Sequence, residues 1–457
     1  MRTFRLHSFL LLAFCCGVSA FGAAEKPARV PTPDDRYKAD ILVVIAHPDD
    51  ETAITGYLAR AIFDEHKRVA VIYGTRGNSG GNAVGFEQAA SLAAVREIEG
   101  RRALASFGIS NVWFLGGPDT PGQDVLRSLE TWNHGSALDQ TVRLVRLTRP
   151  EVILTWLPAY SAGENHGDHQ AAGVIATEAF GIAGDPTVFP EQVTAPRNRS
   201  SISNLTEGLH AWQPQKLYYF SDAAHTDFLE SKGPSYATTD ESKSKGVPYY
   251  KLVAEQMSFH LTQDDTGQFA ANALKKGDLK AFREPVRFVF GKSLVGGKAT
   301  DDILFGVKSE PITFVRDSGY QASSQTGVTA ELGGPWAFYK QFWAAHGLNH
   351  LDNLLAPEVA IGISSTLSVP VLVRNNTDGD QEVSLRVALP QGWTLLSNAT
   401  TWSIAPHADL PVELYLKTPA KVESDWQEIG VAVETAAKGE PIRLPLKVNL
   451  TQTALPQ

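Results

Sequence analysis

The stretch ILVVIAHPDDE, residues 41–51, decides the predicted fold. Its apolar first half is typical of a buried strand, and the apolar run stops abruptly at His47. Asp49, Asp50 and Glu51 follow within four positions, and no cation lies close to them in the sequence. A strand that ends in a turn, with Asp50 capping the next helix, is one interpretation. The turn does not by itself account for three neighbouring carboxylates.

The composition predicts a folded protein of more than one domain. The chain has 457 residues, of which 43% are hydrophobic, enough for a core in each of two or three domains. The net charge at pH 7 is -9, and the basic residues do not gather into a stripe. These features argue against nucleic acid and anionic membrane surfaces as partners.

Residues 1–24 have the features of a cleaved export signal. Arg2 and Arg5 precede the apolar segment FLLLAFCCGVSA, and small residues follow it. We therefore expect a secreted or periplasmic protein whose mature chain has no transmembrane segment, because no later apolar run is long enough to span a bilayer. Both cysteines of the chain lie within this signal, so disulfides and cysteine nucleophiles are excluded together.

The pattern over residues 37–265 predicts a Rossmann-like α/β domain. Short apolar runs alternate with longer amphipathic ones, as expected of a mostly parallel sheet with helices on both faces. The expected strands are ILVVIA, VAVIYG, VWFLG, VILTWL and KLYYFS. The expected helices cover residues 52–66, 87–107, 136–148 and 249–261. Residues 355–451 show short alternating runs that predict an all-β sandwich, and residues 266–354 form a connecting region of no predicted fold.

A second polar cluster follows the fourth expected strand. The stretch ENHGDHQAAG, residues 164–173, places His166, Asp168 and His169 before an alanine-rich helix. Because parallel strands end at one edge of a sheet, the two clusters should converge. Two histidines and one carboxylate with an open fourth position form a hydrolytic zinc site, and a divalent cation would neutralise the carboxylates. Each cluster by itself also fits a plain loop and helix cap.

Two other hypotheses compete with a metal site. The stretch GNSGG, residues 77–81, matches G-x-S-x-G, which would make Ser79 the nucleophile of an esterase with His169 downstream. No helix follows the motif directly, so a glycine loop bordering the pocket is the favoured interpretation. The third hypothesis is a non-catalytic glycan-binding or surface protein, in which the sandwich is the working part and the first domain is a scaffold.

AHPDDE at residues 46–51 and HGDH at residues 166–169 together resemble the PIG-L/LmbE-like family of zinc-dependent N-acetylglucosaminyl deacetylases. The likeness extends through TRGNSG, REIEGRRALASFGI, FLGGPD and KLVAEQMSFHLTQ and covers about half of the chain. The resemblance implies a hydrolase that holds one zinc ion, or another divalent metal, per chain. It also implies removal of an N-acyl group, acetyl in the first instance, from an amino sugar or a related small amide.

The resemblance further implies a role for individual residues. His47, Asp50 and His169 match the family's metal ligands, and Asp49 matches the general base that acts on the metal-bound water. His166 matches a histidine that stabilises the oxyanion or protonates the leaving amine, and Asp168 lies where it could orient that histidine. Arg96 and Asp119 match positions that contact substrate.

The chain also departs from the family pattern. Asn78 stands where many relatives carry an acidic residue, and Thr262 replaces the serine of a late H-S-Q feature formed by His260 and Gln263. The C-terminal stretch ALPQGWTL, residues 388–395, resembles sandwich modules of carbohydrate-active enzymes, which suggests glycan contact by that domain. The implied substrate is a small molecule or a glycoconjugate.

Overall fold

The computed structural model describes most of the chain outside its two ends. The described residues are 35–159, 166–194, 209–222, 229–308, 326–397, 401–421, 426–435 and 440–451. The predicted export signal at residues 1–24 lies outside them. None of the helices in this part of the chain has the length and apolar character needed to span a membrane.

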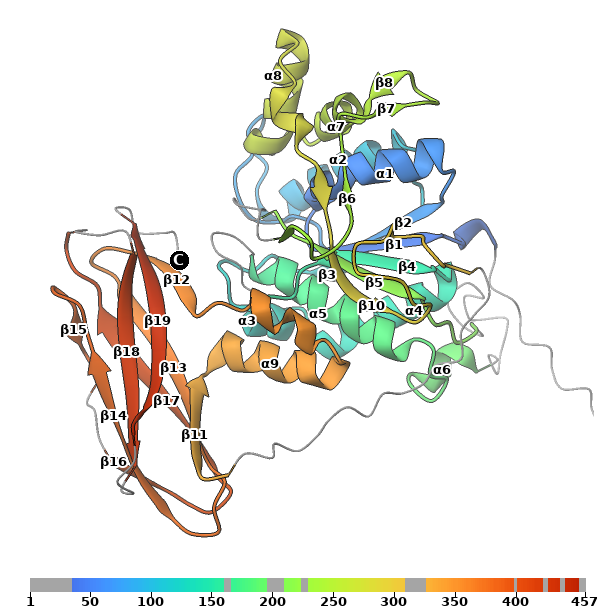
Figure 1. Ribbon diagram of the computed structural model, residues 1–457. Coiled ribbons are helices and arrows are strands. Elements are labelled where there is room, and N and C mark those ends of the chain that lie inside the picture. The colour runs from blue at the N-terminus through green and yellow to red at the C-terminus, as the bar shows by residue number, and fades with distance from the viewer. Residues whose placement is uncertain are drawn as a thin grey trace, which may run out of the picture.

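A six-stranded sheet forms the centre of the first domain, in the order β10-β5-β4-β1-β2-β3 (Figure 1). The strands are β1 (Ile41–Ile45), β2 (Val69–Thr75), β3 (Val112–Gly117), β4 (Val152–Trp156), β5 (Lys216–Phe220) and β10 (Val289–Ser293). β1 to β5 run parallel, and β10 pairs antiparallel with β5. Every residue of β1, β2, β4 and β5 is buried, as expected of strands that are covered on both faces.

Helices cover both faces of this sheet. α1, α2 and α7 lie on one face, and α3, α4 and α5 lie on the other (Figure 1). The helices are α1 (Thr55–Ala59), α2 (Ala89–Ala105), α3 (Val125–Thr131), α4 (His134–Thr148), α5 (Gly167–Ile182), α6 (Pro190–Val193), α7 (Tyr249–Met257) and α8 (Phe269–Lys276). Short antiparallel pairs join β6 (Ser235–Tyr236) to β9 (Val286–Arg287) and β7 (Glu241–Ser242) to β8 (Val247–Pro248). The predicted fold class is confirmed for this domain.

The helical segment after β1 differs from the regular helix predicted over residues 52–66. It begins earlier, with the 3-10 turn η2 (Asp50–Ile54), continues as α1 and ends in the π turn η3 (Arg60–Asp64). Asp50 and Glu51 in the first turn are buried. The tight turn therefore directs both carboxylates into the protein at the edge of the sheet. A cap on a solvent-exposed helix would instead leave them exposed.

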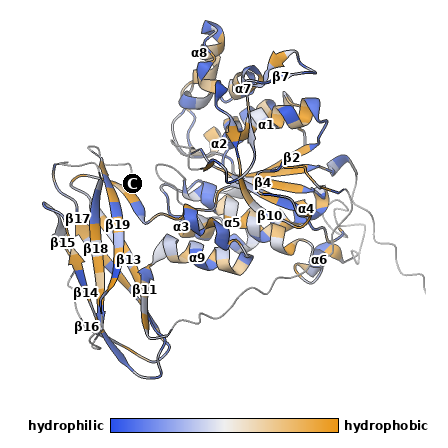
Figure 2. Cartoon of the chain, viewed as in Figure 1, coloured by the Kyte–Doolittle hydropathy of each residue, from blue (hydrophilic) through white to orange (hydrophobic). Residues whose placement is uncertain are grey.

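The second domain is the predicted β-sandwich. Its two sheets have the orders β11-β13-β17-β15 and β12-β19-β18-β14-β16. The strands are β11 (Val328–Leu332), β12 (Glu358–Gly362), β13 (Thr366–Asn375), β14 (Gln381–Ala388), β15 (Thr394–Leu395), β16 (Thr401–Ile404), β17 (Asp409–Lys417), β18 (Trp426–Thr435) and β19 (Ile442–Thr451). Apolar and polar residues alternate along these strands, whereas the central strands of the first domain are continuously apolar (Figure 2). The alternation places one face of each sheet in the core.

Helix α9 (Gly334–His346) connects the two domains. The chain enters the sandwich at β11, leaves it for α9, which lies against α5, and returns at β12 (Figure 1). Tyr339, Phe342 and Trp343 of α9 belong to the hydrophobic core of the first domain. The Tyr339 hydroxyl donates a hydrogen bond to Gln170 of α5. The connecting region of no predicted fold thus contains β10 and α9, which complete the first domain, and β11, which belongs to the sandwich.

Candidate metal centre and active site

The loops after β1 and β4 bring the two polar clusters together at the carboxyl edge of the sheet. His47 and Asp50 follow β1, and His166 is the N-cap residue of α5, which carries His169 in its first turn. The possible ligand atoms of His47, Asp50 and His169 all lie within 4.8 Å of one another. The same limit holds for a second, overlapping group of His47, His166 and Asp168. The structure therefore brings together the three residues predicted as metal ligands.

The Asp50 carboxylate has one oxygen committed to the protein and one facing the histidines. Oδ2 accepts hydrogen bonds from the backbone N–H groups of Ala46 and His47, at 2.8 and 2.9 Å, and from Trp156 Nε1, at 2.7 Å. Oδ1 lies 3.2 Å from His169 Nε2 and 3.5 Å from His47 Nδ1. Two imidazole nitrogens and one carboxylate oxygen are a donor set that fits Zn²⁺.

A second carboxylate faces the other ring nitrogen of each histidine, and only that of His47 is within hydrogen-bond distance. His47 Nε2 lies 3.2 Å from Asp168 Oδ2, and His169 Nδ1 lies 3.9 Å from Asp222 Oδ2. Histidine ligands of metals commonly have such a partner, which fixes the ring and its tautomer. Trp156 also stacks on the His169 ring, with 4.1 Å between the ring centroids.

The charges of this cluster perturb one another strongly. Burial lowers the pKa of His47, but the negative charge of Asp50 and the bond to Asp168 outweigh burial and raise it well above its ordinary value. Burial likewise opposes ionisation of Asp50, yet the two histidines hold the pKa of this carboxyl well below its usual range. Protons on the histidines thus supply the positive charge that a divalent cation would replace.

Asp49 directly precedes Asp50 in the chain, but it does not belong to the group formed by His47, Asp50 and His169. Its backbone adopts φ 121° and ψ -17°, and its carboxylate accepts a hydrogen bond from Thr266 Oγ1 at 3.1 Å. Burial, followed by the charge of Asp50, raises the pKa of Asp49 to about 7. A carboxylate with this pKa can accept a proton near neutral pH.

Asp168 lies beside His166, while its hydrogen bonds go to other residues. Asp168 is fully buried and accepts hydrogen bonds from Thr120, through its backbone N–H at 2.8 Å and its hydroxyl, and it also contacts His47. His166 Nδ1 lies 3.7 Å from Asp168 and has no hydrogen-bond partner among the described residues. Burial, with the charge of His47, lowers the pKa of His166 to about 4, so this imidazole is neutral at pH 7.

Arg96, predicted to contact substrate, is mostly bonded to the protein. Its guanidinium donates to the carbonyl oxygens of Gly77, Ser79 and Gly81, at 3.2, 2.7 and 2.9 Å, and to Thr262 Oγ1 at 3.3 Å. These four bonds use most of its five N–H donors. The contacts show Arg96 holding the glycine loop in place.

Asp119 joins the same loop and keeps one oxygen free. Its Oδ2 accepts from the backbone N–H of Ser79 at 2.6 Å, and its own N–H donates to Asn78 Oδ1 at 2.8 Å. Its Oδ1 is buried and has no partner among the described residues. Ser79 itself is exposed on the long loop between Thr75 and Ala89, so it does not occupy the strand-to-helix turn that a nucleophile elbow requires.

Glu51, the third carboxylate after β1, is neutralised by a buried histidine. It is fully buried and accepts hydrogen bonds from Tyr73 at 2.8 Å, Gln256 at 2.8 Å and His260 at 2.7 Å. Burial opposes its charge, but the charge of His260 holds the pKa of Glu51 below its ordinary value. From sequence, Glu51 is interpreted only as favourable to the dipole of the following helix, and its contact with His260 is not predicted. Asp222 was also missed, although an aspartate directly after the KLYYFS strand could have been found by the strand-end rule.

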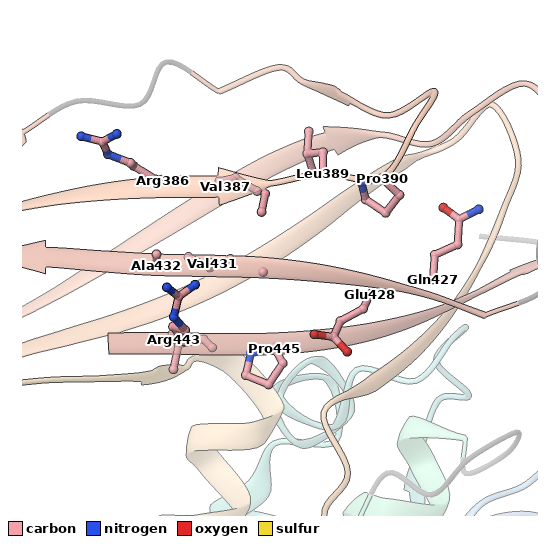
Figure 3. A pocket seen from close by; sticks show the side chains of 13 residues that line it. Arg386, Val387, Leu389, Pro390, Gln427, Glu428, Val431, Ala432, Arg443 and Pro445 are labelled. Carbon is pink, nitrogen blue, oxygen red and sulfur yellow. The ribbon is translucent and has the colours of Figure 1, made fainter. Parts of the chain in front are cut away.

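Two cavities are bordered by neighbours of the candidate site but by none of its predicted metal ligands, and a third lies elsewhere. A cavity of about 390 Å³ is bordered by Arg96 and Gln263, and one of about 610 Å³ is bordered by Thr52 and Asp222. Asp265 borders both. The third cavity, of about 820 Å³, lies on the sandwich over β14, β18 and β19 (Figure 3). The residues that line it include none from the two polar clusters.

Comparison with known proteins agrees with the sequence motifs. Residues 42–180 match the family model PIG-L, described as GlcNAc-PI de-N-acetylase. The chain therefore carries a PIG-L family domain, and the predicted resemblance is confirmed. The matched residues include both polar clusters and exclude α7, α9 and the sandwich.

Several curated proteins resemble the same part of the chain. The 1D-myo-inositol 2-acetamido-2-deoxy-alpha-D-glucopyranoside deacetylase 1 of Catenulispora acidiphila is 29% identical, over 38% of this chain and 58% of that protein. The deacetylase of the same name from Geodermatophilus obscurus is 31% identical, over 33% of this chain and 56% of that protein. The chain thus spans little more than half the length of these relatives.

Among solved structures, N,N'-diacetylchitobiose deacetylase from Pyrococcus horikoshii is 18% identical and has a TM-score of 0.36. The likeness covers 56% of this chain and 84% of that one. A conserved protein from Thermus thermophilus is also 18% identical, with a TM-score of 0.35, over 58% of this chain and all of that one.

Proposed function

We propose that this protein is an exported, metal-dependent N-deacetylase that removes an acyl group, acetyl in the first instance, from an amino sugar or a related small amide. The observation that carries the proposal is the convergence of His47, Asp50 and His169 within 4.8 Å, with Asp49 beside them. The PIG-L match and the relatives, named as deacetylases of a glucosamine conjugate, support the same reaction.

The donor set supports zinc as the metal. His47 Nδ1, Asp50 Oδ1 and His169 Nε2 would hold the ion, since Asp50 Oδ2 is already bonded to three donors of the protein. A bound zinc ion lowers the pKa of a coordinated water and polarises an amide carbonyl. Asp168 would hold the other ring nitrogen of His47, and Asp222 lies 3.9 Å from the other ring nitrogen of His169.

Two further residues would move protons and stabilise charge. Asp49 would be the general base, because it directly precedes the predicted ligand Asp50 and has one carboxylate oxygen that accepts no hydrogen bond in the described part of the chain. His166 would donate a hydrogen bond to the developing oxyanion through the N–H of its neutral ring, since its Nδ1 has no partner among the described residues. It could protonate the leaving amine only after first taking up a proton, for example the one that Asp49 accepts from water.

The substrate contacts proposed from the family are distributed over the glycine loop. Asp119 has a buried, unpartnered oxygen that could accept a hydrogen bond from a sugar hydroxyl. Arg96 would act mainly by holding the loop over residues 77–81, with one N–H left for substrate. We infer export from residues 1–24 alone, and glycan contact by the sandwich is supported by its cavity, which Arg443 and Gln427 border (Figure 3).

Release of acetate from N-acetylglucosamine glycosides tests this function. The purified protein should release acetate, lose the activity on treatment with 1,10-phenanthroline, and regain it when zinc is resupplied. A fluorophosphonate probe for activated serines should not label Ser79. Activity that survives complete chelation, together with labelling of Ser79, would replace the metal-dependent function with the esterase hypothesis.

A further inference from the structure

Residues 260–266 lie over the turn that carries Asp49, although they are far away in sequence and outside the region matched by the family model. His260 Nε2 bonds Glu51 Oε1 at 2.7 Å, and Gln263 Nε2 donates to the Pro48 carbonyl at 2.6 Å. These two contacts join residues 209 and 215 positions apart. The segment thus forms hydrogen bonds with both the backbone of the turn, at Pro48, and one of its buried side chains, Glu51.

Gly267 allows this segment to fold closely on itself. A Cβ atom at this position would lie 2.0 Å from the His260 carbonyl oxygen, so no side chain fits there. The Gly267 N–H donates to the Gln263 carbonyl at 2.9 Å, within the π turn η5 (Asp264–Gln268). The tight turn places the neighbouring Thr266 against the carboxylate of Asp49.

Thr266 provides the one hydrogen bond that the Asp49 carboxylate receives from the part of the chain that the structure describes. The Thr266 hydroxyl is 3.1 Å from Asp49 Oδ2, and Thr266 is only 9% exposed. The positive φ of Asp49 is a strained conformation that costs about 1–3 kcal/mol and persists only where the surroundings impose it. The carboxylate therefore depends on a contact from another segment for its orientation.

We propose that Thr266 is a positioning residue that orients Asp49 for proton transfer. This inference rests on the proposed function, in which Asp49 is the general base. By binding Oδ2, the hydroxyl fixes the side-chain rotamer and leaves Oδ1 free to accept the proton. A base that is already oriented requires no rotation during the reaction, whereas a rotating one spends much of its time in unproductive positions.

Kinetics of Thr266 variants distinguish positioning from a purely structural role. Thr266→Val keeps the size of the side chain and removes the donor, so kcat should fall about 10- to 100-fold with KM nearly unchanged. Thr266→Ser should restore most of kcat. Metal content should stay at the wild-type value in both variants, and both should remain folded at the assay temperature. Thr418→Val, the same change at a buried threonine of the sandwich, should leave kcat unaltered.

Crystal structures of the wild type and Thr266→Val give a readout that does not depend on turnover. We expect one Asp49 conformer bonded to Thr266 in the wild type, and a rotated or divided carboxylate in the variant. An unmoved Asp49, or a kcat within twofold of wild type, would overturn the inference. If Asp49 moves but the wild type hydrolyses no N-acylated amino sugar, the proposed function fails and the orienting contact stands.

Discussion

Charged side chains are buried at the sheet edge of the first domain and exposed on the C-terminal sandwich. Glu51, Asp168 and His260 are 0% exposed, whereas the sandwich pair Arg386 and Glu434 is 75% and 36% exposed. Among the described residues of the sandwich, the buried polar side chains are those of Asn375 and Thr418, and both are uncharged.

The difference agrees with the proposal that the chemistry takes place in the first domain. Removing an ion from water costs several kcal/mol, which pairing offsets only where the geometry is favourable, so buried charges need specific partners. The described part of the sandwich has no such buried charges, and its charged side chains remain in contact with solvent. The same type of substitution should therefore change activity or stability more in the first domain than in the sandwich.

The largest difference should appear when one carboxylate is neutralised in each domain. Asp49→Asn should lower kcat about 10²- to 10⁴-fold, because the general base is lost, while zinc remains bound. Asp378→Asn, at an exposed carboxylate of the sandwich, should leave kcat unchanged. Steady-state kinetics and elemental analysis check both variants. Full activity of Asp49→Asn with normal zinc would refute the role of this residue.

Glu51→Gln should be the most destabilising of these changes. It leaves a buried His260 without its counter-charge, which costs about 3–5 kcal/mol of unfolding free energy. Glu434→Gln on the sandwich surface should cost less than about 1 kcal/mol. Urea denaturation measures both. Equal losses at the two positions would mean that burial of the charge at Glu51 has no special energetic weight.

The pH dependence of Glu51→Gln sharpens this test. Despite burial, the His260 charge lowers the pKa of Glu51, so its contribution is present above the ordinary value of 4.5 and is lost as the pH falls through the folded pKa. Glu51 likewise overrides burial and raises the pKa of His260, so that contribution is present below 6.5 and is lost at higher pH. The stability gap between variant and wild type should be largest from pH 4.5 to 6.5.

Tyr339→Phe tests whether α9 is part of the first domain. Loss of its hydrogen bond to Gln170 should lower the unfolding free energy by about 1–2 kcal/mol. Tyr415→Phe, the same change at an exposed tyrosine of the sandwich, should have no measurable effect. Thermal unfolding of the two variants gives the comparison. Equal Tm values for both variants would show that the contact of α9 with α5 contributes nothing.

The smallest effect is expected at Arg443, which borders the cavity on the sandwich. Arg443→Ala should change unfolding free energy by less than about 0.5 kcal/mol, as is usual for surface residues, and should leave acetate release from a small glycoside unchanged. If the sandwich contacts glycans, the variant should migrate faster than wild type in affinity electrophoresis through a polysaccharide gel. A large loss of activity on a small substrate would contradict the separation of the two domains in function.

Most of the central sheet could be predicted from sequence because β1, β2, β4 and β5 are fully buried. Such strands give continuous apolar runs, and the rule that ligands bind at the carboxyl ends of parallel strands placed both clusters at one edge. The convergence of His47 and His169 across more than a hundred residues followed from that rule alone. The alternation of apolar and polar residues likewise allowed the sandwich to be predicted.

Contacts between distant, non-periodic segments could not be predicted. Glu51 meets His260, and Asp49 meets Thr266, through turns whose sequences carry no periodic signal. Helix α9 has apolar residues on several sides because it faces two domains, so its pattern did not reveal its place. The observed partner of Asp168 depends on where Thr120 lies, which requires the folded loop after β3.

The metal content of the purified protein, beside that of a His47→Ala/His169→Ala double variant, tests the central claim most directly. Elemental mass spectrometry should find about one zinc ion per wild-type chain and almost none in the variant, since three protein ligands are the usual set of a hydrolytic site. Circular dichroism should confirm that the variant is folded. Absence of metal from the wild type, even after zinc is resupplied, would contradict the account and leave the two clusters as a turn and a helix cap.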